Sequence, residues 1–161
     1  MMVTRLGGTA YILEKFDAEA ALAAIQQFAI SHSQWVPTMF VRLLKLDESV
    51  RLAYDVSSLE YAIHAAAPCP IEIKQQMIDW LGPVIYEYYS GTEANGSTAI
   101  TTEEWLEHKG SVGKAIHGEI HILDDDGREL PPGQPGTVYF AKGSDFSYHK
   151  DPEKTRLAKN D

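Results

Sequence analysis

The fold of this chain is decided by the stretch Val84-Ile85-Tyr86-Glu87-Tyr88-Tyr89-Ser90-Gly91-Thr92-Glu93-Ala94-Asn95-Gly96. Its first residues favour a buried β-strand, and the residues from Tyr89 onward form a polar, glycine-containing loop. Tyrosine offers a flat face to a heterocycle, glycine lets backbone N–H groups approach a ligand, and glutamate binds hard cations such as Mg²⁺ through oxygen. The loop therefore predicts a nucleotide-phosphate site, with an ordinary turn after a strand as the alternative.

Short apolar runs alternate with helical patterns on the N-terminal side of this loop. The expected strands are residues 9–13, 33–36, 59–64 and 84–88, and the expected helices follow Asp17, run from Pro37 to Leu46, run weakly from Glu48 to Tyr54 and run from Pro70 to Leu81. Strands that alternate with helices of this length need crossover connections. The sequence therefore predicts an α/β fold with a largely parallel sheet and flanking helices.

The pattern changes after Gly110, where the helical periodicity disappears. A capping box at Thr101-Thr102-Glu103-Glu104 predicts a short helix before this point, and Asp151 is expected to cap another near the end. Between them, β-runs at 119–123 and 137–141 are separated by glycine- and proline-rich turns. We therefore expect an α/β part at 1–109, a small antiparallel β-subdomain at 110–145 and a helical tail at 146–161.

A second candidate segment, Ala65-Ala66-Ala67-Pro68, follows the strand expected at 59–64. Small side chains at a strand end let a flat ligand lie against the backbone. Ligands of open parallel sheets bind outside the carboxyl ends of the strands, so this segment and the Tyr89 loop are predicted to border one crevice. His64 is interpreted as a core residue, because a single histidine in an apolar strand usually packs.

Composition excludes several classes of protein. The 161 residues carry 14 Lys and Arg against 23 Asp and Glu, a net charge of −9 that argues against nucleic acid as a partner. No apolar run approaches the roughly 18 residues of a membrane span, and no signal-peptide pattern opens the chain. The single cysteine, Cys69, cannot form an internal disulfide, which fits a cytoplasmic setting.

Residues Tyr89-Ser90-Gly91-Thr92-Glu93 match a Tyr-Gly-x-Thr-Glu motif, and further matching blocks surround it in order. These blocks are Trp35-Val36-Pro37-Thr38-Met39-Phe40-Val41-Arg42-Leu43-Leu44, Ala65-Ala66-Ala67-Pro68-Cys69-Pro70, Gly110-Ser111-Val112-Gly113-Lys114-Ala115 and residues 126–136. With them the chain resembles the adenylate-forming superfamily of acyl-CoA synthetases, luciferases and adenylation domains, and most of all the bacterial fatty-acyl-CoA synthetases. The resemblance covers nearly the whole chain.

The resemblance implies roles for individual residues. Tyr89 would stack on adenine, Thr92 would hydrogen-bond a phosphate and Glu93 would hold Mg²⁺, so that Thr92 and Glu93 are the expected catalytic residues. The implied nucleotide-binding residues are Ala66, Ala67, Pro68, Tyr89, Ser90, Gly91 and Thr92, and the implied acyl-binding residues are Trp35, Met39, Ala65 and Gly96. Core packing is the favoured alternative for Trp35 and Met39. Ala65 and Ser90 stand where the superfamily more often has glycine.

The implied reaction activates a carboxylic acid, expected to be a fatty acid, with ATP and Mg²⁺ and passes the acyl group to CoA. The superfamily's Ser/Thr/Gly-rich phosphate loop, its Tyr-Arg-Thr-Gly-Asp motif and its catalytic lysine domain have no match among the 161 residues. We therefore expect an internal fragment of a large N-terminal domain, inactive alone and able to self-associate through uncovered apolar surface. A non-catalytic nucleotide-binding or interaction module and a domain that loads a carrier protein are the alternatives.

Overall fold

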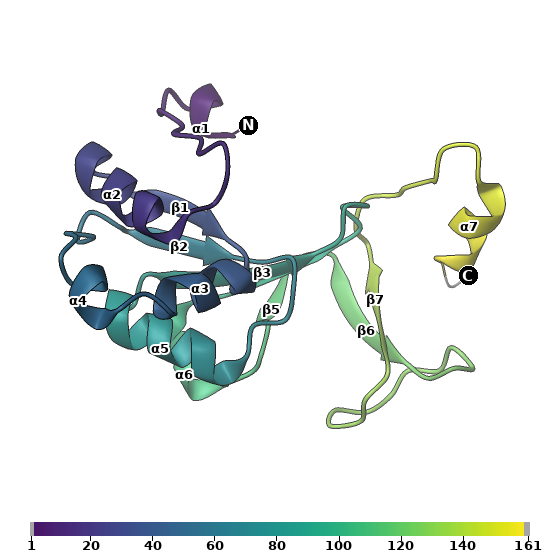
Figure 1. Cartoon of the computed structure of the whole chain (residues 1–161). Coiled ribbons are helices and arrows are strands. Elements are labelled where there is room, and N and C mark those ends of the chain that lie inside the picture. Colours follow the sequence, from purple (N-terminus) through teal and green to yellow (C-terminus); the bar gives the residue numbers. More distant parts are fainter. Residues whose placement is uncertain (1, 160–161) are drawn as a thin grey trace.

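The computed structural model describes residues 2–159, whose larger sheet has five strands in the order β1-β2-β3-β4-β5 (Figure 1). The strands are β1 (His32–Trp35), β2 (Tyr61–His64), β3 (Ile85–Ser90), β4 (Ser97–Ile100) and β5 (Lys114–His117). The β1–β2 and β2–β3 pairs are parallel, whereas β4 runs antiparallel to both β3 and β5. The predicted α/β class, with parallel strands joined through helices, is confirmed. Strands β4 and β5 were not predicted from the sequence.

Helices connect and cover these strands. They are α1 (Met2–Arg5), α2 (Ala18–Phe28), α3 (Pro37–Leu44), α4 (Glu48–Arg51), α5 (Ile71–Leu81), α6 (Thr102–Glu107) and α7 (Pro152–Leu157). The predicted caps are confirmed: Asp17 accepts from the backbone N–H of Ala20, and Thr101 forms a reciprocal capping box with Glu104. Asp151 accepts from the backbone N–H of Lys154 in the same way.

The prediction of a strand at residues 9–13 is wrong. These residues are irregular and exposed, with Ile12 at 79% exposure, and Tyr11 stacks on the Phe28 ring at a centroid distance of 4.0 Å. β-propensity measures how well a side chain fits a pleated, half-buried surface, so it has no effect where no strand pairs with the segment. Among residues 2–159 the sheet ends at β1, which pairs there with β2 alone.

The core lies between one face of the larger sheet and the helices. Leu22 of α2, Phe40 and Leu43 of α3 and Met77 of α5 are each at most 1% exposed. They form one hydrophobic cluster with the sheet residues Ala62, Ile85 and Ile100. We call this body, residues 18–117, the α/β layer. Its packing fixes β2 and β3 side by side, which sets the positions of the segments that follow them.

A second, two-stranded sheet projects from the α/β layer, and α7 lies beyond it (Figure 1). Strand β6 (Glu119–Leu123) pairs antiparallel with β7 (Thr137–Ala141), which confirms both predicted β-runs. We call residues 119–141 the β-arm. Strand β5 lies inside the range expected for the β-subdomain but pairs with the larger sheet, and the three-part division of the chain stays a prediction. Within residues 2–159, no helix has the length and apolar character needed to cross a membrane.

Candidate functional site

The two segments predicted to border one crevice follow neighbouring parallel strands. His64 of β2 is the register partner of Glu87 of β3, so Ala65 and Tyr88 continue from the same edge of the sheet. Ala65 is 4% exposed, and its backbone N–H donates to the Trp35 carbonyl over 3.3 Å. Ala66 has φ of +74°, a left-handed conformation that favours glycine. Ala65 is therefore buried at the base of the predicted crevice.

Ala66, Ala67 and Pro68 are exposed beside Ala65. Their small side chains leave the backbone open at the end of β2, as the sequence led us to expect for a flat ligand. Whether they contact a nucleotide stays a prediction.

Strand β3 extends through Tyr89 and Ser90, which were expected in the loop, because both residues pair with β4. The loop that follows is closed by its own hydrogen bonds. The Ser90 hydroxyl donates to the Gly96 carbonyl over 2.9 Å, and the Ala94 N–H donates to the Gly91 carbonyl over 3.2 Å. Tyr89 stacks on Phe140 of the β-arm at a centroid distance of 6.2 Å and remains 44% exposed. The Tyr89 ring is thus held by one aromatic neighbour and keeps surface for a heterocycle.

Glycine at the end of this loop allows the β-arm to pack closely. A Cβ atom on Gly96 would lie 2.0 Å from the Phe140 ring, and a Cβ on Gly143 would lie 1.5 Å from the Asn95 carbonyl oxygen. The structure therefore places Gly96 under Phe140, where any larger residue would displace the ring. Its expected contact with the acyl group stays a prediction.

Glu93 is the acidic residue at the tip of the site. The Tyr148 hydroxyl donates to its Oε1 over 2.8 Å, and this hydrogen bond is the main cause that lowers the pKa of Glu93. The same bond raises the pKa of Tyr148. The other oxygen, Oε2, lies beside Gly91, where an added Cβ would be only 2.8 Å away. Thr92 is exposed between them.

A magnesium ion is compatible with this carboxylate. Residues 2–159 contain no group of three or more His, Cys, Asp or Glu side chains able to hold a metal by themselves. Mg²⁺ commonly keeps several waters and takes one or two carboxylates together with substrate phosphates. A single ionised Glu93 therefore fits the usual protein contribution to a Mg²⁺–nucleotide site.

Trp35 and Met39 lie with the core. Trp35 is 7% exposed, its ring contacts Phe40 at a centroid distance of 6.2 Å, and its Nε1 donates to the Ser33 hydroxyl over 2.7 Å. Met39 is partly buried against the same cluster. These positions agree with the packing role that was favoured for both, and their acyl-binding role stays a prediction.

A buried charge network lies directly behind the two strand ends, and the sequence did not point to it. Lys74 of α5 donates from Nζ to Oε2 of Glu87 over 2.6 Å, and Nζ lies 5.0 Å from the centre of the Trp105 ring. Burial lowers the pKa of Lys74, although the bond to Glu87 opposes this shift. A lysine in an amphipathic helix is usually exposed, which is why this one gave no signal.

His64 belongs to the same network. Its Nε2 lies 3.4 Å from Oε2 of Glu87, but Lys74 already neutralises that carboxylate. Burial, with a smaller contribution from the Lys74 charge, lowers the pKa of His64 to about 3. The imidazole is therefore neutral near pH 7, in keeping with its predicted core role. Burial also raises the pKa of the nearby Cys69 thiol to about 11, which makes this thiol a poor nucleophile.

Known proteins match the chain along most of its length. The AMP-binding enzyme family matches residues 1–146. The acyl-CoA ligase sidI of Aspergillus fumigatus is 33% identical over 154 residues, which cover 90% of this chain and 25% of that protein. The 4-coumarate–CoA ligase-like 3 of Arabidopsis thaliana is 30% identical over 146 residues, which cover 88% of this chain and 26% of that protein.

Among solved structures, the amide bond synthetase McbA of Marinactinospora thermotolerans has a TM-score of 0.81 and 27% identity, and the match covers 95% of this chain and 31% of that one. The chain spans about a quarter of the length of the two sequence relatives. It belongs to the AMP-binding enzyme family, which confirms the superfamily resemblance carried by its sequence motifs.

Proposed function

We propose that the whole protein activates a carboxylic acid with ATP to an acyl-adenylate and then transfers the acyl group to CoA. The observation that carries this proposal is the convergence of two segments at one sheet edge. The small-residue segment Ala65–Pro68 follows β2, and the segment Tyr89–Glu93 begins in the last two residues of the adjacent parallel strand β3 and continues into the loop after it. The family membership supports the nucleotide as the ligand of this edge.

The proposed reaction needs a separate contribution from each of three residues, Tyr89, Thr92 and Glu93. A carboxylate oxygen of the acid attacks the α-phosphorus of ATP, the bond from that phosphorus to the bridging oxygen breaks, and pyrophosphate leaves. Both reactants are anions, so their approach needs oriented donors and positive charge. Tyr89 would hold the adenine, the Thr92 hydroxyl would donate to a phosphate oxygen, and Glu93 would hold Mg²⁺, which supplies the positive charge.

We propose a fatty acid as the substrate and the cytoplasm as the compartment. Ala65 is a small buried residue at the end of β2, where the family resemblance implies that the carboxyl end of an acyl group would lie. Relatives named as 4-coumarate–CoA ligase-like proteins make an aromatic acid the competing substrate. Turnover of a panel of aliphatic and aromatic acids by the whole protein distinguishes the two.

ATP–pyrophosphate exchange tests the reaction. We expect exchange by the whole protein that depends on the acid and on Mg²⁺, and a large loss of exchange in Glu93→Gln. The 161-residue chain alone should show no ATP–pyrophosphate exchange, because its sequence has no phosphate loop that ends in Pro-Lys. Exchange at the wild-type rate and wild-type metal dependence in Glu93→Gln would contradict the role of Glu93. Nucleotide binding by the whole protein without exchange would favour a non-catalytic module.

A different acyl acceptor is the second candidate. An amide bond synthetase superposes on this chain with a TM-score of 0.81, and its name indicates an amide product. Transfer to an amine or to a carrier-protein thiol would follow the same adenylation step. Mass spectrometry of the products formed from one acid with CoA, an amine and a carrier protein in competition identifies the acceptor.

A further inference from the structure

The contact between Tyr148 and Glu93 joins two distant parts of the chain. The phenol oxygen and the carboxylate Oε1 are 2.8 Å apart, and the two residues are separated by 55 positions in the sequence. The loop that carries Glu93 extends from the α/β layer toward the β-arm, and Tyr148 lies on the segment between β7 and α7 (Figure 1). No local sequence pattern predicts such a contact.

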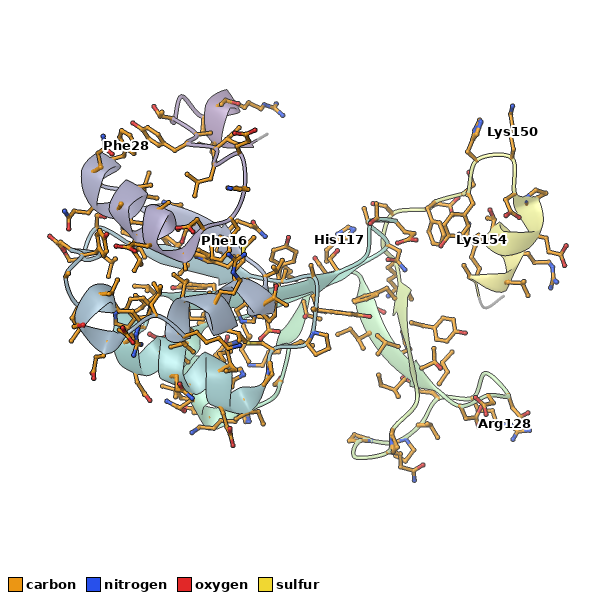
Figure 2. All side chains as sticks on the ribbon, viewed as in Figure 1. Phe16, Phe28, His117, Arg128, Lys150 and Lys154 are labelled. Carbon is orange, nitrogen blue, oxygen red and sulfur yellow. The ribbon has the colours of Figure 1, made fainter. Side chains whose placement is uncertain are left out.

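Tyr148 is itself held in place by α7 and its approach. Its backbone N–H donates to the Thr155 hydroxyl over 2.9 Å, and the Phe146 ring meets it edge-on at a centroid distance of 5.6 Å. The Lys154 ammonium lies 4.2 Å from the centre of the Tyr148 ring, and Figure 2 shows Lys154 on α7, far from the α/β layer. The phenol is thus a positioned donor whose ring is fixed by contacts independent of Glu93.

The two oxygens of Glu93 have different surroundings. Oε1 accepts the phenol hydrogen bond, whereas Oε2 lies beside Gly91, 2.8 Å from the position that a Cβ atom would take there. A neutral donor on one oxygen restricts rotation of the carboxylate and leaves its negative charge for a cation. A carboxylate that is already held in its metal-binding orientation loses less conformational freedom when the metal ion binds.

We propose that Tyr148 is a positioning residue for Glu93: its hydroxyl holds Oε1 so that Oε2 is presented to the Mg²⁺–nucleotide at the loop. This inference rests on the proposed function, because it takes Glu93 as the metal-binding carboxylate. The competing explanation is that the bond only tethers the C-terminal segment to the loop. A tether would affect every substrate to the same extent, whereas positioning acts on the metal.

The Mg²⁺ dependence of pyrophosphate exchange by the whole protein separates these explanations. In Tyr148→Phe the ring contacts with Phe146 and Lys154 are kept and only the hydroxyl is lost. We expect the Mg²⁺ concentration at half-maximal exchange to rise on the order of tenfold, as for the loss of a hydrogen bond to a charged group, with the KM of the carboxylic acid unchanged. An unchanged Mg²⁺ requirement, or equal increases for metal and acid, would overturn the proposal.

Tyr139→Phe is the matched control, because the Tyr139 hydroxyl of β7 has no hydrogen-bond partner within residues 2–159. It removes a phenol hydroxyl from the β-arm and should leave the Mg²⁺ requirement unchanged. A shift equal to that of Tyr148→Phe would also contradict the proposal.

Carbon-13 NMR of the glutamate carboxyl groups in the 161-residue chain tests the contact without any activity. The Glu93 signal is assigned from its absence in Glu93→Gln, and it should titrate at higher pH in Tyr148→Phe than in the wild type. An identical titration would show that the phenol does not hold the carboxylate and would overturn the proposal. If the whole wild-type protein shows no exchange, the proposed function fails, and this titration alone decides whether Tyr148 holds Glu93.

Discussion

The α/β layer and the C-terminal region, residues 119–159, differ strongly in how many hydrophobic side chains they bury. Buried hydrophobic side chains from the helices and strands of the α/β layer form one cluster, whose members lie between Ala18 and Trp105 in the sequence. Beyond Trp105, Leu123 is the only buried hydrophobic residue in the described part of the chain. Val138 of the β-arm and Leu157 of α7 are 42% and 69% exposed. The C-terminal region therefore has strands and a helix with little core of its own.

This difference shows that the candidate site is shared between a rigid body and a weakly packed one. The α/β layer positions Ala65 and Tyr89 through the pairing of β2 with β3. The C-terminal region supplies Phe140 against Gly96 and Tyr148 against Glu93. Segments with few buried contacts open locally at low free energy, so the half of the site made by the β-arm and α7 is expected to be the more mobile half.

The largest expected effect comes from the buried ion pair of the α/β layer. Lys74→Met should lower the free energy of unfolding by about 3–5 kcal/mol, because it leaves the Glu87 carboxylate buried without its partner. Urea denaturation followed by tryptophan fluorescence measures this loss. Lys142→Met is the control in the C-terminal region: it breaks the exposed pair with Glu119, which solvent screens, and should leave stability unchanged. Equal losses in the two variants would remove the contrast between the regions.

The loss of unfolding free energy caused by a cavity should also be larger in the α/β layer than in the C-terminal region. Leu43→Ala removes a side chain that is 1% exposed in the main cluster and should cost about 2–5 kcal/mol of unfolding free energy. Leu123→Ala removes the single buried hydrophobic residue of the β-arm and should cost clearly less, because fewer buried neighbours surround the cavity. Both variants are compared by urea denaturation. A larger loss for Leu123→Ala would mean that the β-arm carries the stability of the chain.

Acid should destabilise the α/β layer through His64. The pKa of His64 is lowered to about 3 in the folded chain, so between about pH 6.5 and that value only the unfolded chain binds the proton. The free energy of unfolding should therefore fall as pH falls, by about 1.4 kcal/mol per pH unit from this residue. His64→Asn should reduce the slope of stability against pH by this amount. The same slope in variant and wild type would contradict the buried neutral imidazole.

The smallest expected effects come from the helix caps. Asp17→Ala removes the cap of α2, which packs in the main cluster, and should cost about 1 kcal/mol of global stability. Asp151→Ala removes the equivalent bond at α7 and should instead raise the amide exchange rates of that helix alone. Hydrogen exchange measured by NMR on both variants checks this. Global destabilisation by Asp151→Ala would show that α7 unfolds together with the α/β layer.

Much of the fold and part of the site could be predicted from local patterns. The helical periodicity after Asp17, the capping box at Thr101 and the β-runs at 119–123 and 137–141 each correspond to an observed element. The juxtaposition of Ala65 and Tyr88 followed from the rule that parallel strands end at one edge. The strand expected at 9–13 failed, because propensity cannot supply a pairing partner.

By itself the sequence determined which residues could serve as ligands, because residue types and their spacing fix the chemistry of a loop such as Tyr89–Glu93. Only the tertiary structure decided how that loop is held. Phe140 over Gly96, Tyr148 on Glu93 and Lys74 against Glu87 are contacts between elements, and two of them join residues more than 40 positions apart. Such pairings depend on how helices and strands pack, and no pattern within a single segment records them.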